Sequence, residues 1–308
     1  MKKRSEWRTA LRRDWQLYVF LLIPITYILI FAYAPMGGIV MAFQDYSARK
    51  GILGSDWVGL DNFRRFFESY NSRRAITNTI VLSLYTIVAG FPIPICFALM
   101  LNSLRREKFK KVTQTIVNMP HFISVTVMVG ILMQIFNPRT GLYGAIGEWI
   151  TGNYPGDILG SAAAFRHLYV WSGIWQNFGW NSVIYTAALS SVDPTYHEAA
   201  MLDGATRLQR VRHVDIPAIL PTVVTMLILR MGSVMSIGFE KVYLMQNGLN
   251  MATSDIISTY VYQVSLAADG ISDFSYATAI GLFNNVIEFI LITIVNKISK
   301  KVSETSLW

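Results

Sequence analysis

Residues 193–217 have the sequence DPTYHEAAMLDGATRLQRVRHVDIP and lie between two apolar stretches of a mostly hydrophobic chain. Asp193 is a good N-cap, and Pro194 suits the first helical position, where the N–H that proline lacks would have no partner. Gly204 comes about three turns later and suits the left-handed end of a helix. The segment therefore predicts a short helix over 194–204 with both of its ends marked.

A second short helix is expected after the glycine turn. Thr206 can cap its beginning, and Ile216–Pro217 opens the next apolar stretch. On the first helix, residues at three- and four-residue spacing share one face and form a stripe. Its members are Tyr196, Ala199, Ala200 and Asp203. Because the alanine side chains are small, a partner's surface can approach this stripe closely.

The composition is that of a membrane protein. Of 308 residues, 53% are hydrophobic and 15% are charged, whereas a soluble globular chain carries roughly 25% charged residues. The single cysteine, Cys96, excludes a disulfide within the chain and a cysteine-rich metal site, and no two histidines have metal-ligand spacing. The net charge of +8 matters through its distribution along the chain rather than as a sign of nucleic-acid binding.

Six stretches are long and apolar enough to cross a bilayer as helices, which takes about 20 residues each. They lie at about 17–42, 77–101, 112–136, 167–190, 216–237 and 274–297. The first is too long for a cleaved signal peptide. The expected fold class is therefore all-α, a polytopic membrane protein with six transmembrane helices, and its transmembrane domain covers 17–308.

Lysine and arginine collect in the cytoplasmic loops of membrane proteins. Of the 27 such residues, 17 fall on one side of the predicted spans, in the tail 1–16, the loop 102–111, the loop 191–215 and the C-terminal tail. Both termini and the segment at 193–217 are therefore expected in the cytoplasm. On the outer side, WVGLDNFRRFF (57–67) has the spacing of an amphipathic helix that lies along the membrane surface.

In the cytoplasmic segment, Glu-Ala-Ala is followed at fixed spacing by a glycine and then by aliphatic-x-aliphatic-Pro. This pattern resembles the EAA signature of binding-protein-dependent ABC importer permeases. The residues that carry it are Glu198, Ala199, Ala200, Gly204, Val214, Ile216 and Pro217, with Asp203, Ala205 and Pro221 in the extended pattern. Val214 and Ile216 stand where the family usually has isoleucine and leucine.

Further segments extend the resemblance over most of the chain. WVGLDNFRRFF (57–67), FEKVYLMQNG (239–248) and the spacing of the spans look like the carbohydrate-uptake branch of the family. The stretch at 34–63 is similar to permeases for polysaccharide-derived oligosaccharides, including alginate and rhamnogalacturonan importers. The resemblance thus implies an oligosaccharide cargo, which can be acidic, and a permease for a non-sugar solute is the alternative.

The resemblance implies a type I importer in the bacterial cytoplasmic (inner) membrane. Its partners would be a second permease that is a different chain, two cytoplasmic ATPase subunits and an extracytoplasmic substrate-binding protein, with no nucleic acid. The 194–204 helix would couple to the ATPase, and the coupling residues would be Glu198, Ala199, Ala200, Asp203, Gly204 and Pro217. The chain has no GxxxxGK[ST] motif, so ATP and Mg²⁺ would belong to the partner ATPase. This chain would then be no enzyme and would hold no cofactor or metal.

Sugar sites combine aromatic faces with amide and hydroxyl groups, and the predicted spans carry such residues. The candidates for the substrate pathway are Trp171, Trp175, Gln176, Asn177, Trp180, Asn181, Arg230, Asn284, Asn285 and Glu288. Aromatic residues at the membrane interface and amides that bridge helices are the alternative interpretation. Arg230 is expected either to pair with Glu288 or to attract an acidic sugar.

Two other functional classes make different demands on the sequence. A secondary transporter would use coupled carboxylates within the membrane, and Glu288 is the one deep carboxylate of the predicted spans. A membrane enzyme would need a convergent catalytic group, and the sequence suggests none. The importer permease is therefore the function that the sequence favours.

Overall fold

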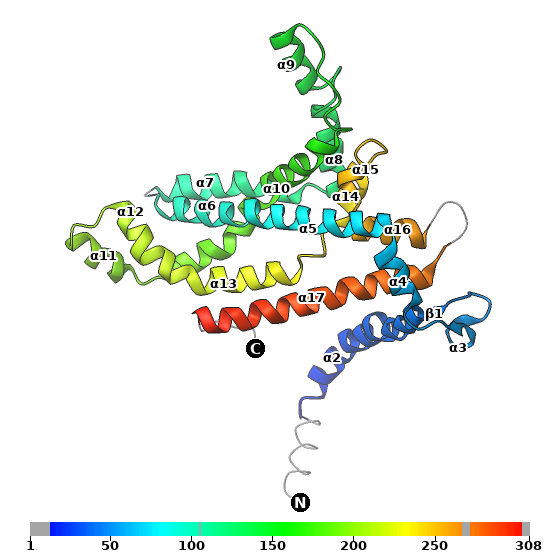
Figure 1. Cartoon of the computed structure of the whole chain (residues 1–308). Coiled ribbons are helices and arrows are strands. Elements are labelled where there is room, and N and C mark those ends of the chain that lie inside the picture. The colour runs from blue at the N-terminus through cyan, green and yellow to red at the C-terminus, as the bar shows by residue number, and fades with distance from the viewer. Residues whose placement is uncertain (1–12, 105, 267–271, 304–308) are drawn as a thin grey trace, which may run out of the picture. The chain divides into compact units, whose positions relative to one another are not determined.

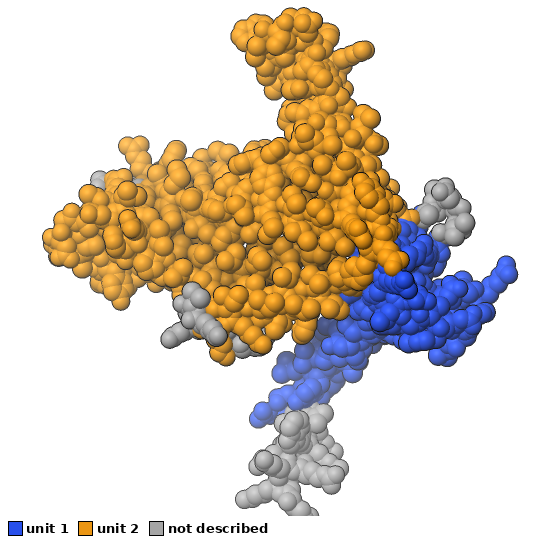
Figure 2. All heavy atoms as spheres, in the orientation of Figure 1, with its two compact units in different colours: residues 1–66, 264–282 blue, residues 67–263, 283–308 orange. Residues whose placement is uncertain are grey.

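The described chain is helical almost throughout. The computed structural model describes residues 13–104, 106–266 and 272–303, and in them one two-stranded antiparallel sheet pairs Gln44–Asp45 (β1) with Asp56–Trp57 (β2). The all-α fold class is confirmed. Figure 1 labels the elements, and Figure 2 colours the two units into which the chain divides, residues 1–66 with 264–282 and residues 67–263 with 283–308. Most of the predicted cytoplasmic tail 1–16 lies outside the described residues.

The smaller unit begins with one continuous helical run. It comprises α2 (Trp15–Ile28), η1 (Leu29–Tyr33) and η2 (Ala34–Phe43). Pro24 lies inside α2 without ending it. No residue of α2 or η1 is buried, although nearly all are apolar. A helix that is apolar all round suits hydrocarbon rather than water, in agreement with a membrane span.

A hairpin and the helix after it complete the smaller unit, together with residues 272–282. The hairpin tip is α3 (Gly51–Gly54), and α4 (Asp61–Glu68) follows β2. Arg65 of α4 forms an ion pair with Asp273 at 2.6 Å and lies over the ring of Tyr276. The helix predicted within 57–67 therefore exists, but it begins four residues later because Trp57 belongs to β2.

Most of the remaining helices belong to the larger unit. In chain order they are α5 (Tyr70–Gly90), α6 (Pro92–Asn102), α7 (Glu107–Asn118), η3 (Met119–Phe122), α8 (Val125–Ile135), α9 (Leu142–Thr151), α10 (Ala162–Ser190), α11 (Pro194–Leu202), α12 (Arg207–Arg210), η4 (Val211–Asp215), α13 (Ile216–Gly232), α14 (Phe239–Met245), α15 (Met251–Ser254) and α16 (Ile257–Ser265). The last helix, α17 (Phe274–Ser303), begins in the smaller unit and ends in the larger one. α10 is central and contacts α5, α6, α7, α13 and α15.

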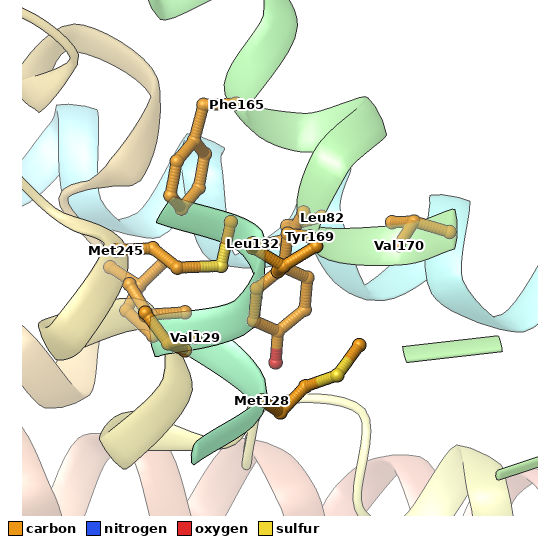
Figure 3. Close-up of a cluster of buried hydrophobic side chains, with 10 residues drawn as sticks. Leu82, Met128, Val129, Leu132, Phe165, Tyr169, Val170 and Met245 are labelled. Atoms are coloured by element: carbon orange, nitrogen blue, oxygen red, sulfur yellow. The ribbon is translucent and has the colours of Figure 1, made fainter. Parts of the chain in front are cut away.

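The main apolar core of the larger unit forms where α5, α8, α10 and α14 meet (Figure 3). Its buried members are Leu82, Met128, Val129, Leu132, Phe165, Tyr169, Val170, Val242, Met245 and Ile256. A second cluster joins α6, α10 and α13 through Ala98, Tyr185, Leu189 and Ile219. The two clusters hold opposite ends of α10, so this helix is fixed along most of its length.

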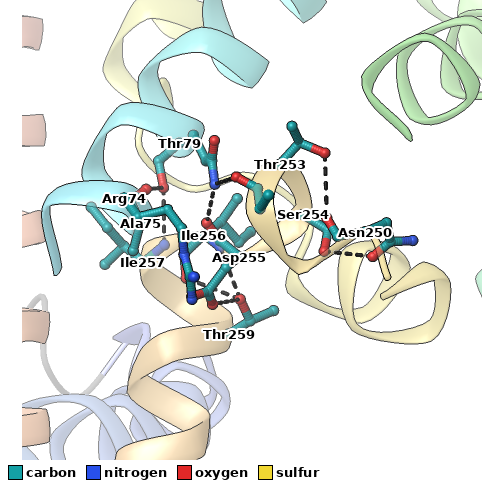
Figure 4. Close-up of polar contacts among 12 residues, drawn as sticks. Arg74, Ala75, Thr79, Asn250, Thr253, Ser254, Asp255, Ile256, Ile257 and Thr259 are labelled. Atoms are coloured by element: carbon teal, nitrogen blue, oxygen red, sulfur yellow. Dashed lines mark hydrogen bonds and ion pairs between the residues drawn. The ribbon is translucent and has the colours of Figure 1, made fainter. Parts of the chain in front are cut away.

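A buried polar network ties residues 250–259 to α5 (Figure 4). Arg74 Nη2 lies 2.7 Å from Asp255 Oδ2, and the Asp255 side chain is 1% exposed. Asn78 donates to the carbonyl oxygen of Asp255 and accepts a hydrogen bond from Arg166 of α10. Because buried polar groups are costly without partners, this network fixes the segment after α15 against α5 and α10.

We expect Asp255→Ala to lower the free energy of unfolding by about 3–5 kcal/mol, because it leaves the Arg74 guanidinium partly buried without its carboxylate. The matched control is Asp56→Ala, which breaks the ion pair with Lys50 in the smaller unit, where the Asp56 side chain is 73% exposed. That change should cost no more than about 1 kcal/mol. Denaturant unfolding of the purified protein in detergent measures both, and equal losses would contradict a structural role for the Arg74–Asp255 pair.

Four helical stretches of the described chain are long and apolar enough to cross a membrane: Trp15–Phe43, Tyr70–Asn102, Arg207–Gly232 and Phe274–Lys300. A fifth is obtained if α7, η3 and α8 count as one bent span. α10, at the predicted fourth span, has 29 residues but is not among them, because tryptophan, asparagine and glutamine lower its mean hydropathy. The count of six spans therefore stays a prediction.

The third predicted span, 112–136, differs from a straight helix. The chain bends by 95° between Glu107–Phe122 and Val125–Ile135. Pro120 lies at the start of η3, and the Ser124 side chain caps α8 by accepting from the Val127 N–H. Gln176 of α10 donates to the carbonyl oxygen of Ile123 at 2.8 Å. The break is stable because these side chains bond to backbone groups that the helix no longer pairs.

Candidate functional site

The helix predicted at 194–204 is α11, which ends at Leu202. The Asp193 carboxylate accepts a hydrogen bond from the Thr195 N–H at 2.9 Å, and hydrogen bonds from Thr195 lower the pKa of Asp193. At the other end, the Ala205 N–H donates to the carbonyl oxygen of Ala200. Gly204 has φ of +78°, and its N–H donates to the carbonyl oxygen of Met201. These two bonds form a Schellman motif, which needs the left-handed residue that glycine supplies.

The second helix of the loop begins as predicted but ends elsewhere. Thr206 and Gln209 form a capping box, in which the Thr206 hydroxyl accepts from the Gln209 N–H and the Gln209 side chain accepts from the Thr206 N–H. α12 then continues through the π-helical turn η4 into α13 without a break. The loop therefore consists of α11 and a tight turn, and the second helix is the first part of the helical stretch Arg207–Gly232, which contains the predicted fifth span.

The surface of α11 is open. None of its residues is buried, and Tyr196 and Leu202 are 65% and 89% exposed. Glu198, Ala199 and Asp203 are exposed as well, and Ala200 is half-buried. Exposed large apolar side chains beside a carboxylate and small residues are typical of a surface that a partner covers. Pro217 lies apart from this surface, in the first turn of α13.

A cavity of about 400 Å³ lies along the inner face of α10, between α5, α6, α13 and α14. Four of the predicted pathway residues line it: Gln176, Asn177, Asn181 and Arg230. The sequence did not predict that Lys241, Tyr169 and Tyr185 also line it. A cavity with amides, phenol rings and two cations can bind hydroxyl groups, sugar faces and a carboxylate.

The two cations of the cavity differ in how the protein holds them. Lys241 is 8% exposed, and its ammonium donates to the carbonyl oxygen of Tyr169 at 3.0 Å and to the Ser172 hydroxyl at 2.9 Å. Burial lowers the pKa of Lys241 to about 8, so the Lys241 amine is mostly protonated at neutral pH. The Arg230 guanidinium forms no hydrogen bond or ion pair with the described residues, so it remains available to a ligand.

Several of the predicted pathway residues contact the break of the third span instead of open space. Asn177 accepts a hydrogen bond from His121 at 2.9 Å, and the His121 ring stacks on Trp180 with 4.6 Å between centroids. Gln176 bonds to Ile123, as described above. These three side chains bridge helices, while Gln176 and Asn177 also reach the cavity.

The other candidates lie outside the cavity. Trp171 donates to the Tyr85 hydroxyl at 2.9 Å, and Trp175 and Asn285 are exposed. Glu288 accepts from the Ser236 hydroxyl at 2.6 Å and from the Asn284 amide at 3.4 Å. The ion pair between Arg230 and Glu288, one of the two alternatives for Arg230, is not formed among the described residues, and other partners satisfy the carboxylate.

Comparison with known families gives one match that covers most of the chain. Residues 71–304 match the family described as the binding-protein-dependent transport system inner membrane component. The match contains the break of the third span, the loop that carries α11 and every residue of the cavity.

Individual relatives match over nearly their full length. Protein LplB of Bacillus subtilis (strain 168) is 40% identical over 99% of this chain and 95% of its own. The polygalacturonan/rhamnogalacturonan transport system permease protein YteP of the same organism is 38% identical over 100% and 95%. Among solved structures, a bacterial alginate ABC transporter in complex with an alginate pentasaccharide-bound periplasmic protein has a chain of 36% identity. The TM-score is 0.88, over 97% of this chain and 99% of that one.

Proposed function

Because the chain belongs to the family of binding-protein-dependent transport system inner membrane components, we propose that it forms half of the pathway of an ATP-driven importer for an acidic oligosaccharide. The chain is a transport component. Two of its relatives are named for polygalacturonan/rhamnogalacturonan and for alginate, and both are matched over nearly all of this chain. ATP-driven uptake of an acidic oligosaccharide by the reconstituted complex tests the proposal, and uptake without ATP would contradict it.

The observation that carries the cargo proposal is the pair of cations in one cavity. Arg230 and Lys241 line the same space with Tyr169, Tyr185 and the amides of α10. A guanidinium binds a carboxylate with two parallel hydrogen bonds, whereas amides and phenols bind sugar hydroxyls and ring faces. Two positive charges that line one cavity repel each other, so a negatively charged ligand explains them better than a neutral one.

The proposed site of coupling to the ATPase is α11 with the turn at Gly204. Its exposed residues include Glu198, which can meet basic groups of a partner, and Ala199, which allows close approach. The capped ends make α11 a rigid helix, and a rigid helix can transmit a displacement from the partner to the spans. ATP and Mg²⁺ would bind to the ATPase, because this chain carries no phosphate-binding motif.

The remaining partners and the orientation belong to the same proposal. They are a second permease that is a different chain, two ATPase subunits and an extracytoplasmic binding protein, in the bacterial cytoplasmic membrane. The excess of lysine and arginine on one side of the predicted spans supports a cytoplasmic location for both termini and α11. A disulfide cross-link between a cysteine at position 199 and the ATPase requires this orientation, and its absence would contradict it.

A further inference from the structure

One carboxylate joins three segments at the cytoplasmic end of the larger unit. Asp215 is 3% exposed and lies in η4, the turn that continues directly into α13. His197 of α11 places Nε2 3.2 Å from Asp215 Oδ1. The Asn102 amide, at the end of α6, donates to the same oxygen at 3.4 Å. Three helical segments, α11, α6 and Arg207–Gly232, therefore meet at the Asp215 side chain.

The space around this contact is hollow rather than packed. A cavity of about 450 Å³ lies between α11, the end of α6 and η4, and its lining includes Leu189, Met201 and Arg210 besides the residues of the contact. No residue of α11 is buried. Apolar packing therefore does little to fix α11, and a polar contact across the hollow has a correspondingly larger effect on its position.

The charges that face Asp215 come from more than one element. His197 and Arg210 both attract the carboxylate, and Arg207 and Glu198 also line the hollow. Arg210 belongs to the same continuous helix as Asp215, so its attraction cannot hold α11 in place. His197 belongs to α11, which the backbone joins to this helix by the turn at residues 203–206.

We propose that His197 and Asp215 are positioning residues that link α11 to the fifth span, so that a displacement of α11 moves Arg207–Gly232 as one body. Without the link, α11 can pivot about the Gly204 turn, and a movement imposed by the ATPase is absorbed there. ATP hydrolysis then continues while transport fails. The inference rests on the proposed function, because it requires that α11 contacts the ATPase.

The variants follow from the geometry. His197→Ala removes the partner of Asp215, which keeps its hydrogen bond from Asn102. His197→Gln keeps an N–H donor near the position of Nε2 and is the conservative rescue. The matched control is His213→Ala, because His213 is an exposed histidine of η4 and bonds to the carbonyl oxygen of Gln209 in its own helix.

The experiment uses the full complex in proteoliposomes, with Cys96→Ala as the background, and it measures sugar transported per ATP hydrolysed. A second measurement is the disulfide cross-link from Ala199→Cys to the ATPase. We expect His197→Ala to lower transport per ATP by about tenfold, the effect of losing a hydrogen bond to a charged group. His197→Gln should restore most of it, His213→Ala should match the wild type, and all variants should form the cross-link.

Each other outcome has a definite meaning. If His197→Ala forms the cross-link and transports as much sugar per ATP as the wild type, the inferred link is overturned while the proposed coupling site stands. If Ala199→Cys forms no cross-link to the ATPase while His197 is intact, the coupling site is overturned and the link with it. A purely structural role would lower the yield of complex without changing transport per ATP, and that result also overturns the inference.

Discussion

Gly204→Val should abolish most transport while the complex still assembles. Gly204 has φ of +78°, and a side chain added there would meet no atom within 4 Å. The cost is therefore a backbone cost, about 1–2 kcal/mol for an ordinary residue in the left-handed region and more for a β-branched one. Relieving that strain unwinds the Schellman turn and reorients α11, so we expect uptake and substrate-stimulated ATP hydrolysis to fall by about tenfold or more.

Two controls separate backbone strain from side-chain volume. Gly204→Asn should retain much of the activity, because asparagine tolerates the left-handed conformation. Gly248→Val should behave as the wild type, since Gly248 also has open space around it and its φ is not positive. Wild-type substrate-stimulated ATPase activity in Gly204→Val would remove the turn from the coupling mechanism.

Arg230→Gln should impair the uptake of acidic oligosaccharides selectively. A hydrogen bond between charged partners contributes about 1.5–3 kcal/mol, which corresponds to a loss of about tenfold to a hundredfold in apparent affinity. Uptake of a neutral oligosaccharide of the same length, if the complex carries one, should change much less. Assembly should be normal, because Arg230 makes no ion pair with Glu288 whose loss would leave a buried charge.

The control for Arg230 is Arg139→Gln, which removes the same charge from an exposed position outside the cavity. Arg230→Lys should recover part of the activity, since the ammonium keeps the charge but not the two parallel hydrogen bonds. Radiolabelled uptake in proteoliposomes measures all three variants. Normal uptake of the acidic sugar by Arg230→Gln would exclude the guanidinium from cargo binding.

The helix at α11 could be predicted closely because its limits are set by local chemistry. Asp193 accepts from the Thr195 N–H, Pro194 has no N–H that would need a partner in the first turn, and the left-handed Gly204 allows the bonds that close the helix. The break of the third span could not be predicted in the same way. Pro120 is compatible with a kink or a break, and the choice depends on Gln176, which is distant in sequence and reaches the Ile123 carbonyl only in the folded chain.

Only part of the cavity lining could be predicted, because the rest again depends on contacts between residues distant in sequence. Arg230 and the amides of α10 belong to apolar spans, where polar side chains are conspicuous in the sequence. Lys241 follows the predicted fifth span, and nothing in the local sequence indicates that α14 packs against α10. Its position depends on contacts with Tyr169 and Ser172, more than sixty residues away in sequence. Whether Lys241 lines the cavity therefore depends on tertiary contacts, which the local sequence does not reveal.

The most direct test of the importer function is uptake by proteoliposomes that contain this chain, its second permease, the ATPase subunits and the binding protein. With ATP and Mg²⁺ supplied on the side of the ATPase, we predict that an acidic oligosaccharide accumulates only when the binding protein is present. Removal of ATP should stop accumulation under any ion gradient. Accumulation driven by a proton or sodium gradient in the absence of ATP would contradict the account, because it would identify a secondary transporter.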